Sequence, residues 1–157
     1  MKQKVTISMI ILISALLQLS VLNGQENYMP GIIVNNDGDN ISGFIDYQHW
    51  SRSPKNIKFT KKITEPSEKY SPEDIHSFQV ANDIFESRNI TVSESPRATS
   101  QLSYDTKYPS KSVTAFLLVL VSGEVSLYQY IDEMGTDYYY VESEKYPLME
   151  LSYFKYF

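Results

Sequence analysis

The chain contains no cysteine at any of its 157 positions. This absence excludes disulfide bonds, thiolate ligands for a metal and a lipid anchor attached through cysteine. Histidine is scarce as well, with only His49 and His76. Their spacing, even with Asp46 or Asp74 as additional ligands, does not have the pattern of a metal site. The sequence therefore predicts a protein without a bound metal, held together by its hydrophobic core alone.

Motifs for catalysis and for phosphate binding are also lacking. There is no Gly-x-Ser-x-Gly elbow, no glycine-rich phosphate loop and no basic cluster. Ser71-Pro72-Glu73-Asp74 is better explained as a helix start than as the site of a catalytic serine. A formal net charge of −5 disfavours binding to nucleic acid and to anionic lipid. We expect no enzymatic activity, no cofactor and no nucleic-acid partner.

Residues 1–25 have the three parts of a secretory signal peptide. Lys2 and Lys4 precede an apolar stretch at 5–22, and short or polar residues follow at 23–25. Ser14, Gln18 and Ser20 interrupt the apolar stretch, which favours a cleaved signal over an uncleaved membrane anchor. Removing Lys2 and Lys4 changes the formal net charge from −5 to −7. We expect a chain secreted across the inner membrane and located in the periplasm or at the outer membrane.

The segment Gly31–Tyr47 predicts a β-hairpin. A β-branched run at 32–34 leads into Asn-Asp-Gly-Asp at 36–39, where Gly38 can supply a positive φ. Apolar and polar residues then alternate over 41–47. Gly43 interrupts the apolar face of this second strand, and we expect either a bulge or a contact too close for a side chain.

Further strands are expected along the rest of the chain, at 57–60, 77–80, 84–88, 89–92, 113–121, 125–131 and 138–142. The nearly continuous apolar run within 113–121 indicates a central strand, since it is too short to span a membrane as a helix. Residues 148–151 are either helical or extended. Residues 94–111, with two prolines and few aliphatic side chains, predict a mobile loop.

These elements predict a mainly β fold in a single domain over residues 26–157. We expect a compact antiparallel sandwich, roll or partly open barrel of about eight strands, with one short helix that starts at Ser71.

The hairpin and the segments after it resemble a set of uncharacterised secreted or envelope proteins of the Bacteroidota. Their pattern reads Gly-x-Ile-Val-x-x-x-Gly-Asp-x-Ile-x-Gly-x-Ile-Asp-Tyr-x-x-Trp, followed by Asn-Pro-x-x-Ile-x-Phe and Tyr-x-Pro-x-Asp-Ile. This chain matches it from Gly31 to Trp50, then at 54–59 and 70–75, and departs at Ser53, where the pattern has Asn. The resemblance implies an envelope location and brings no catalytic residues. Members are often longer, which implies that this chain is a shortened form.

Tyrosine is over-used, with 13 residues against 7 phenylalanines and 1 tryptophan. The aromatic group could form a stacking platform for sugars or peptides, or could simply pack across strands, which we favour. The candidate ligand-binding residues are Trp50, Tyr128, Tyr130 and Tyr139, next to Tyr138 and Tyr140. Asp46 is added because it lies within a strand between apolar neighbours. Alternation favours a solvent-facing Asp46, and the alternative is a carboxylate that faces a ligand or pairs with Lys58.

The leading functional hypothesis is a non-enzymatic envelope or periplasmic module that binds a protein partner or an envelope component such as a glycan. One alternative is a structural part of an outer-membrane assembly, including a shortened barrel-associated protein. This alternative predicts membrane association without a membrane-spanning helix after signal cleavage. A second alternative is an enzyme that acts on glycans or peptides through acids such as Asp46 and Asp74, which would have to converge in a cleft.

Overall fold

The chain folds into one antiparallel sheet, as the computed structural model shows for residues 26–93 and 110–151. The strand order is β10-β9-β8-β7-β6-β5-β1-β2-β3-β4. The strands are β1 (Tyr28–Asn35), β2 (Asn40–Asp46), β3 (Ile57–Thr60), β4 (Glu68–Tyr70), β5 (Ile75–Val80), β6 (Asp83–Ser93), β7 (Ser110–Val121), β8 (Val125–Ile131), β9 (Asp137–Ser143) and β10 (Met149–Glu150). The expectation of a mainly β, open antiparallel fold is confirmed. Within these described ranges no helix is long and apolar enough to cross a membrane.

The predicted hairpin is formed by β1 and β2, which pair from Tyr28 opposite Asp46 to Val34 opposite Asn40. Gly38 in its turn has a φ of 90°, as the Asp-Gly sequence predicts. The side-chain oxygen of Asn35 accepts hydrogen bonds from the backbone N–H groups of two turn residues, Asp37 and Asp39. β5 then pairs with the other edge of β1, so the hairpin lies inside the sheet.

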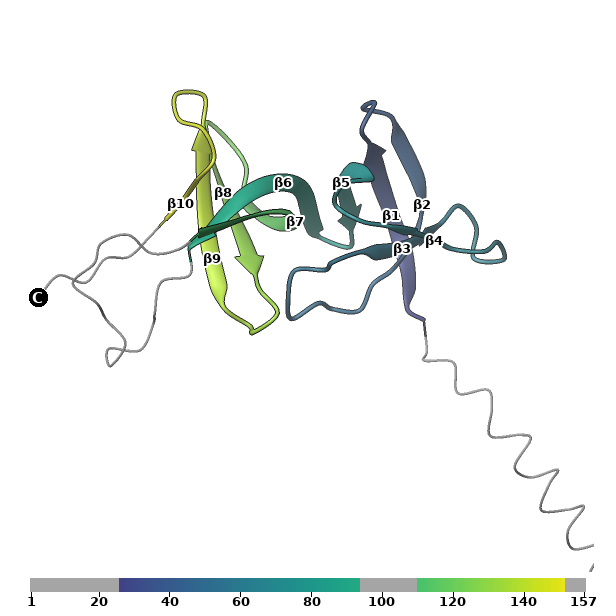
Figure 1. Ribbon diagram of the computed structural model, residues 1–157. Helices are drawn as coiled ribbons and strands as arrows, with labels where there is room; N and C mark the ends of the chain where they lie inside the picture. The colour runs from purple at the N-terminus through teal and green to yellow at the C-terminus, as the bar shows by residue number, and fades with distance from the viewer. Residues whose placement is uncertain (1–25, 94–109, 152–157) are drawn as a thin grey trace, which may run out of the picture.

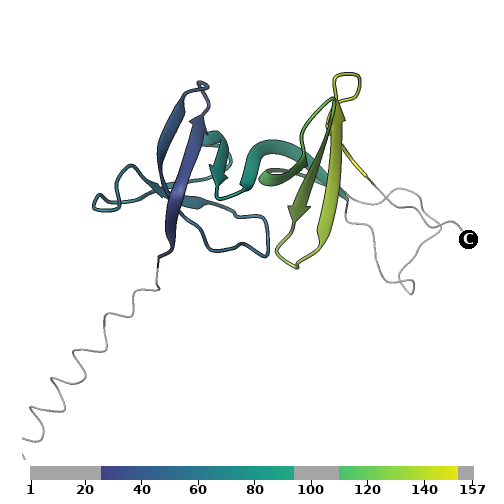
Figure 2. The same ribbon diagram turned by 180° about the vertical axis from the view of Figure 1, so that it is seen from behind.

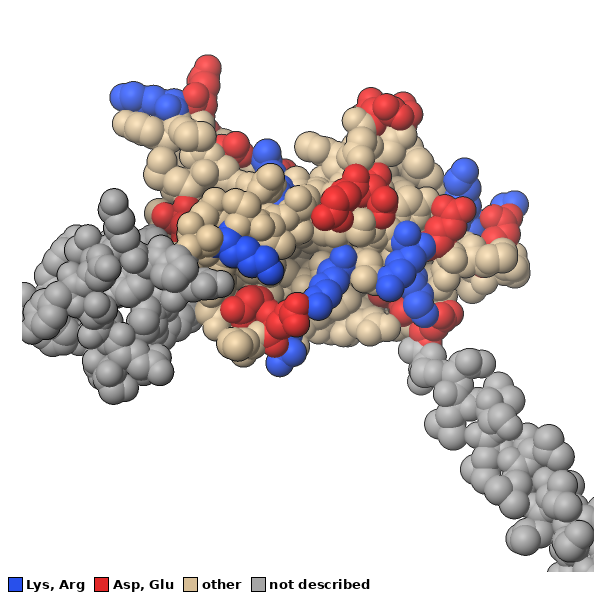
Figure 3. Space-filling model, in the orientation of Figure 1, with Lys and Arg blue, Asp and Glu red and all other residues tan. Residues whose placement is uncertain are grey.

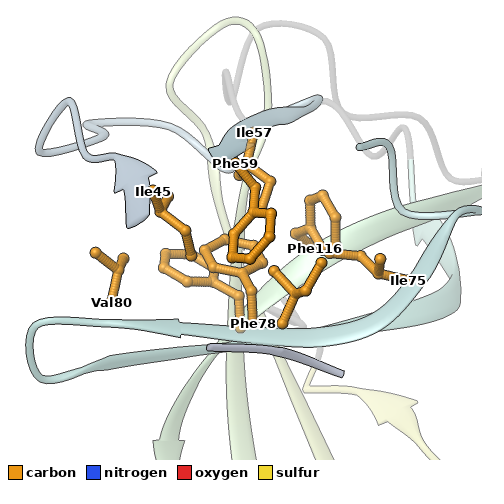
Figure 4. Close-up of a cluster of buried hydrophobic side chains, with 9 residues drawn as sticks. Ile45, Ile57, Phe59, Ile75, Phe78, Val80 and Phe116 are labelled. Atoms are coloured by element: carbon orange, nitrogen blue, oxygen red, sulfur yellow. The ribbon is translucent and has the colours of Figure 1, made fainter. Parts of the chain in front are cut away.

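Two hydrophobic clusters lie on opposite faces of this sheet. Consecutive residues of a strand point to opposite faces, and in β7 Phe116 belongs to the first cluster while Leu117 belongs to the second. The first cluster gathers side chains from β1, β2, β3, β5, β6 and β7 (Figure 4). The second is built on β6, β7, β8 and β9. The two ends of the sheet therefore curl in opposite directions.

Figures 1 and 2 show the result, two lobes joined by the curved strands β6 and β7. We call β1–β5 with the first half of β6 the N-terminal lobe. We call the second half of β6 with β7–β10 the C-terminal lobe. In the C-terminal lobe the sheet curls until β9 and β10 reach β6. The Tyr140 hydroxyl donates to the Thr91 carbonyl at 3.1 Å, and the Ser93 N–H donates to Glu150 Oε2 at 3.2 Å. Side chains thus close what resembles a partly open barrel.

The expected short helix is absent from the described part of the chain. Ser71-Pro72-Glu73-Asp74 forms a turn in which the Asp74 carboxylate accepts from both the N–H and the hydroxyl of Ser71, at 2.7 and 2.6 Å. The capping side chain is therefore Asp74 rather than Ser71. The chain cannot continue as a helix because Ile75 already starts β5 with its side chain buried in the first cluster.

Strand boundaries also differ from the expectation. The two candidates at 84–88 and 89–92 form the single strand β6, and the very short edge strand β4 was not anticipated. Of the two conformations left open for residues 148–151, the structure has the extended one at 149–150, which form β10. Of the predicted mobile loop, residues 110–111 belong to β7 and residues 94–109 lie outside the described residues. The predicted signal peptide at 1–25 also lies outside them.

Candidate functional site

The candidate ligand-binding aromatics do not share one surface. Trp50 packs edge-on against Phe78 and Phe85 in the N-terminal lobe, with ring centroids 5.7 Å apart in each case. Tyr128 is buried in the C-terminal lobe. Tyr139 lies on the opposite face of β9 from Tyr138 and Tyr140, because it is one residue away from each. A single stacking platform that contains all of them is therefore not formed.

Asp46 is buried, with an exposed fraction of 3%, and this differs from the expected solvent-facing position. Its carboxylate accepts from the Asn27 N–H at 2.9 Å and from Gln48 Nε2 at 3.0 Å. The alternative pairing with Lys58 is not found either, since Lys58 donates to Glu26 at 2.7 Å. Simple alternation fails at the end of β2, where the neighbouring backbone of Asn27 and the following residues cover the carboxylate. Asp46 fixes the start of β1 against the end of β2.

A partly buried polar cluster closes the C-terminal lobe between β6 and β9. The Arg88 guanidinium donates to Glu142 Oε2 at 2.9 Å, to the Tyr128 hydroxyl at 3.1 Å and to Glu86 Oε2 at 3.0 Å. Burial acts to lower the pKa of Arg88, but the Tyr128 hydrogen bond and the two glutamates raise it overall. Burial also raises the pKa of Tyr128. These four residues come from three strands, β6, β8 and β9, and no local sequence motif brings them together.

A hollow of about 520 Å³ lies where the two lobes meet. Its lining comes from the β2–β3 connection, the turn before β5, and strands β7 and β8: Arg52, Ser53, Pro54, Lys55, Pro72, Glu73, Val113, Thr114, Ala115, Tyr130, Ile131 and Glu133. Tyr130 is the one candidate aromatic that lines it, and burial followed by the nearby Asp132 and Glu133 charges raises its pKa. Basic and acidic side chains both line the hollow. The lining therefore does not favour a ligand of one particular charge.

The hollow is held by contacts between the lobes. The Ser53 N–H donates to the Ile131 carbonyl at 3.0 Å, and the Ile131 N–H donates back to Ser53 Oγ at 3.0 Å. Lys55 and Glu133 form an ion pair at 2.6 Å. Since the side chains of that pair are 69% and 74% exposed, solvent screening weakens it. The Ser53–Ile131 contact is the stronger tie.

A second candidate is the outer face of the C-terminal lobe, which is apolar across four strands. The register places Val121, Leu127, Val141 and Met149 side by side on β7, β8, β9 and β10. The neighbouring row runs through Leu118, Gln129, Tyr139 and Leu151, since the Leu151 N–H donates to the Tyr139 carbonyl. Leu120, in the register shift of β7, and Val125 adjoin these rows. We call these ten residues the β7–β10 apolar face.

Six side chains of the β7–β10 apolar face have exposed fractions between 39% and 54%: Leu120, Val121, Val125, Tyr139, Met149 and Leu151. The two rows contain no charged residue, and Gln129 is their one polar member. On the side of the molecule drawn in Figure 3, acidic and basic side chains are interspersed over both lobes. Asp137 stands at the border of the face, at the first residue of β9.

The sequence signal for the β7–β10 apolar face is the continuous apolar run Ala115–Val121. Such runs are typical of strands buried on both faces, whereas a strand with one wet face alternates. In β7 the inner face packs in the second cluster, but the outer face beyond Leu118 is open to solvent in the described part of the chain. The sheet therefore buries the run on both faces from Ala115 to Leu117 and leaves Leu120 and Val121 exposed.

The described residues contain no group of three or more histidine, aspartate or glutamate side chains placed to hold a metal ion. The chain matches no protein-family model, no curated protein and no solved structure.

Proposed function

We propose that the chain is a non-enzymatic module of the bacterial cell envelope that binds a partner protein through the β7–β10 apolar face. The observation that carries the proposal is a sheet face that spans four strands and has no charge in its two central rows. Exposed apolar patches of this kind are typical of protein interaction sites.

The β7–β10 apolar face is as large as the largest apolar patches of typical monomers. From the exposed fractions of its six most open residues, it offers at most roughly 500 Å² of surface, within the range of about 300–600 Å² found for such patches. Covering that surface would contribute on the order of 10 kcal/mol before the entropic cost of association. A large driving force for association therefore exists at this face.

The envelope location rests on the signal-like residues 1–25, the acidic net charge and the absence of cysteine. The resemblance to Bacteroidota envelope proteins supports the same location. Asp46 accepts a hydrogen bond at the end of β2, and Asp74 accepts one in the turn before β5. Because each carboxylate holds its own segment of backbone and the two do not converge in one cleft, they support binding rather than catalysis.

The size of the native complex tests this function. In size-exclusion chromatography of a detergent-free envelope extract, the exported chain should elute at an apparent mass well above that of one chain. One full-length chain has a mass of 18.1 kDa. Val121→Lys should shift it to the monomer position, because burying a lysine charge within an apolar interface is costly. Ile84→Lys is the matched control, since Ile84 is an exposed apolar residue on β6 outside the face. If both variants elute with the wild type, the face is not the binding surface.

A further inference from the structure

We infer that the partner which covers the β7–β10 apolar face is a second copy of this chain, packed face to face. This inference rests on the proposed function and names its partner. Two such faces would stack about 10 Å apart as the layers of a β-sandwich. In each C-terminal lobe, the strands β7–β10 would form the layer that meets the other copy, with the second cluster behind it.

The composition of the face suits self-association. A copy of the face meets the same side chains in an isologous pair, and the two central rows place no charge against a like charge. Aliphatic, methionine and tyrosine side chains of different size can interdigitate across such a pair. A partner recognised by charge would require charged residues within the face, and these rows have none.

The area is consistent with a reversible dimer. Two faces of roughly 500 Å² would bury at most about 1,000 Å² together, which is at the low end of specific interfaces. Glu124, Glu144 and Lys145, all exposed, lie in the turns at one end of the face, so this rim carries both signs of charge. The whole chain has a formal net charge of −5, and two acidic copies repel each other, so salt that screens this repulsion should strengthen the dimer.

Sedimentation velocity of the purified, exported chain tests the inference. Over protein concentrations from about 1 μM to about 1 mM we expect a monomer–dimer equilibrium, because an interface of this size and composition gives moderate affinity. Raising sodium chloride should shift the equilibrium toward the dimer. Val121→Lys and Met149→Lys, at opposite ends of one row, should each raise the dissociation constant about tenfold or more, and Ile84→Lys should leave it unchanged. Circular dichroism of each variant verifies its fold.

The outcomes separate the two proposals. A purified chain that stays monomeric at every concentration, while the envelope extract holds a larger complex sensitive to Val121→Lys, overturns the second copy and leaves the proposed function standing. A dimer that weakens with salt and tolerates both lysines overturns the face-to-face arrangement. A monomer in both settings overturns the inference and the proposed function together.

Discussion

Gly43 shows at the scale of a single residue why this sheet needs a glycine. A β-carbon at this position would overlap the Thr60 carbonyl oxygen and the ring of Phe59, which lies over the glycine. Gly43 also pairs with Gly31, where a β-carbon would lie 2.7 Å from the Gln79 carbonyl. The expectation of a contact too close for a side chain is confirmed, and the covering group is an aromatic ring from β3.

Gly43→Val should therefore destabilise the fold by about 2 kcal/mol or more, because backbone and a packed ring must both move. Chemical denaturation followed by circular dichroism measures the change. Gly123→Ala is the control, since the nearest atom to its new β-carbon is 3.9 Å away. Equal stability of the Gly43 variant and the wild type would show that β2 and β3 do not pack as described.

Tyr70 gives the protein a dependence on alkaline pH. Its hydroxyl donates to Glu68 Oε2 at 2.6 Å, and this hydrogen bond, followed by burial, raises the pKa of Tyr70 to about 12. A raised pKa means that the protonated phenol is favoured in the folded state. The associated stability is present below the unfolded pKa of about 10 and is lost as pH rises toward 12.

We expect the free energy of unfolding to fall between about pH 10 and pH 12, and to fall less in Tyr70→Phe, which no longer has the phenol proton to lose. Urea titrations at several pH values measure both. Tyr146→Phe, at an exposed tyrosine in the β9–β10 turn, is the control. If Tyr70→Phe follows the wild-type pH profile, the Glu68 hydrogen bond does not contribute to stability.

At the scale of elements, the contact of the β2–β3 connection with the end of β8 decides how the lobes are tied. Ser53→Ala removes the acceptor of the Ile131 N–H and should cost about 1 kcal/mol. Lys55→Ala, which removes a mostly exposed ion pair, should lower the stability much less than Ser53→Ala does. Amide hydrogen exchange at Ile131, compared in the two variants, measures the difference. Faster exchange in Lys55→Ala than in Ser53→Ala would reverse this ranking.

Much of the element pattern could be predicted from local sequence. The hairpin, β3, β8 and the turn at Gly38 follow from alternation and turn residues, which act over a few positions. The prediction of a helix starting at Ser71 was wrong, because a helix-capping sequence is equally compatible with a tight turn. The burial of the Ile75 side chain in the first cluster favours the turn over the helix. The length of β6 depends on its two partners, β5 and β7, which local propensity does not contain.

The candidate sites were less predictable than the strands. The hollow and the Arg88 cluster join residues from segments far apart in sequence, and only the register of the sheet places them together. Asp46 was expected at the surface because its place in the alternating pattern suggested it. Alternation does not reveal that another segment of the same chain covers the end of the strand. The apolar face was visible in the sequence as the Ala115–Val121 run, but its open outer side appears only with the fold.

At the scale of the whole molecule, the two lobes differ in how their sheet is covered. The N-terminal lobe encloses its cluster between its own strands and Phe116 of β7, whereas the C-terminal lobe leaves an apolar outer face across β7–β10. We therefore propose that this outer face is covered by protein in the envelope.

Methionine oxidation in intact cells tests that claim most directly. Met149 lies on the β7–β10 apolar face and is 44% exposed, and Met134, in the β8–β9 turn, is 88% exposed and serves as the internal control. Mild peroxide treatment followed by mass spectrometry compares the chain in the envelope with the purified chain at low concentration. We predict that oxidation of Met149 relative to Met134 is several-fold lower in the envelope. An equal ratio in the two settings would contradict the claim that a partner covers this face.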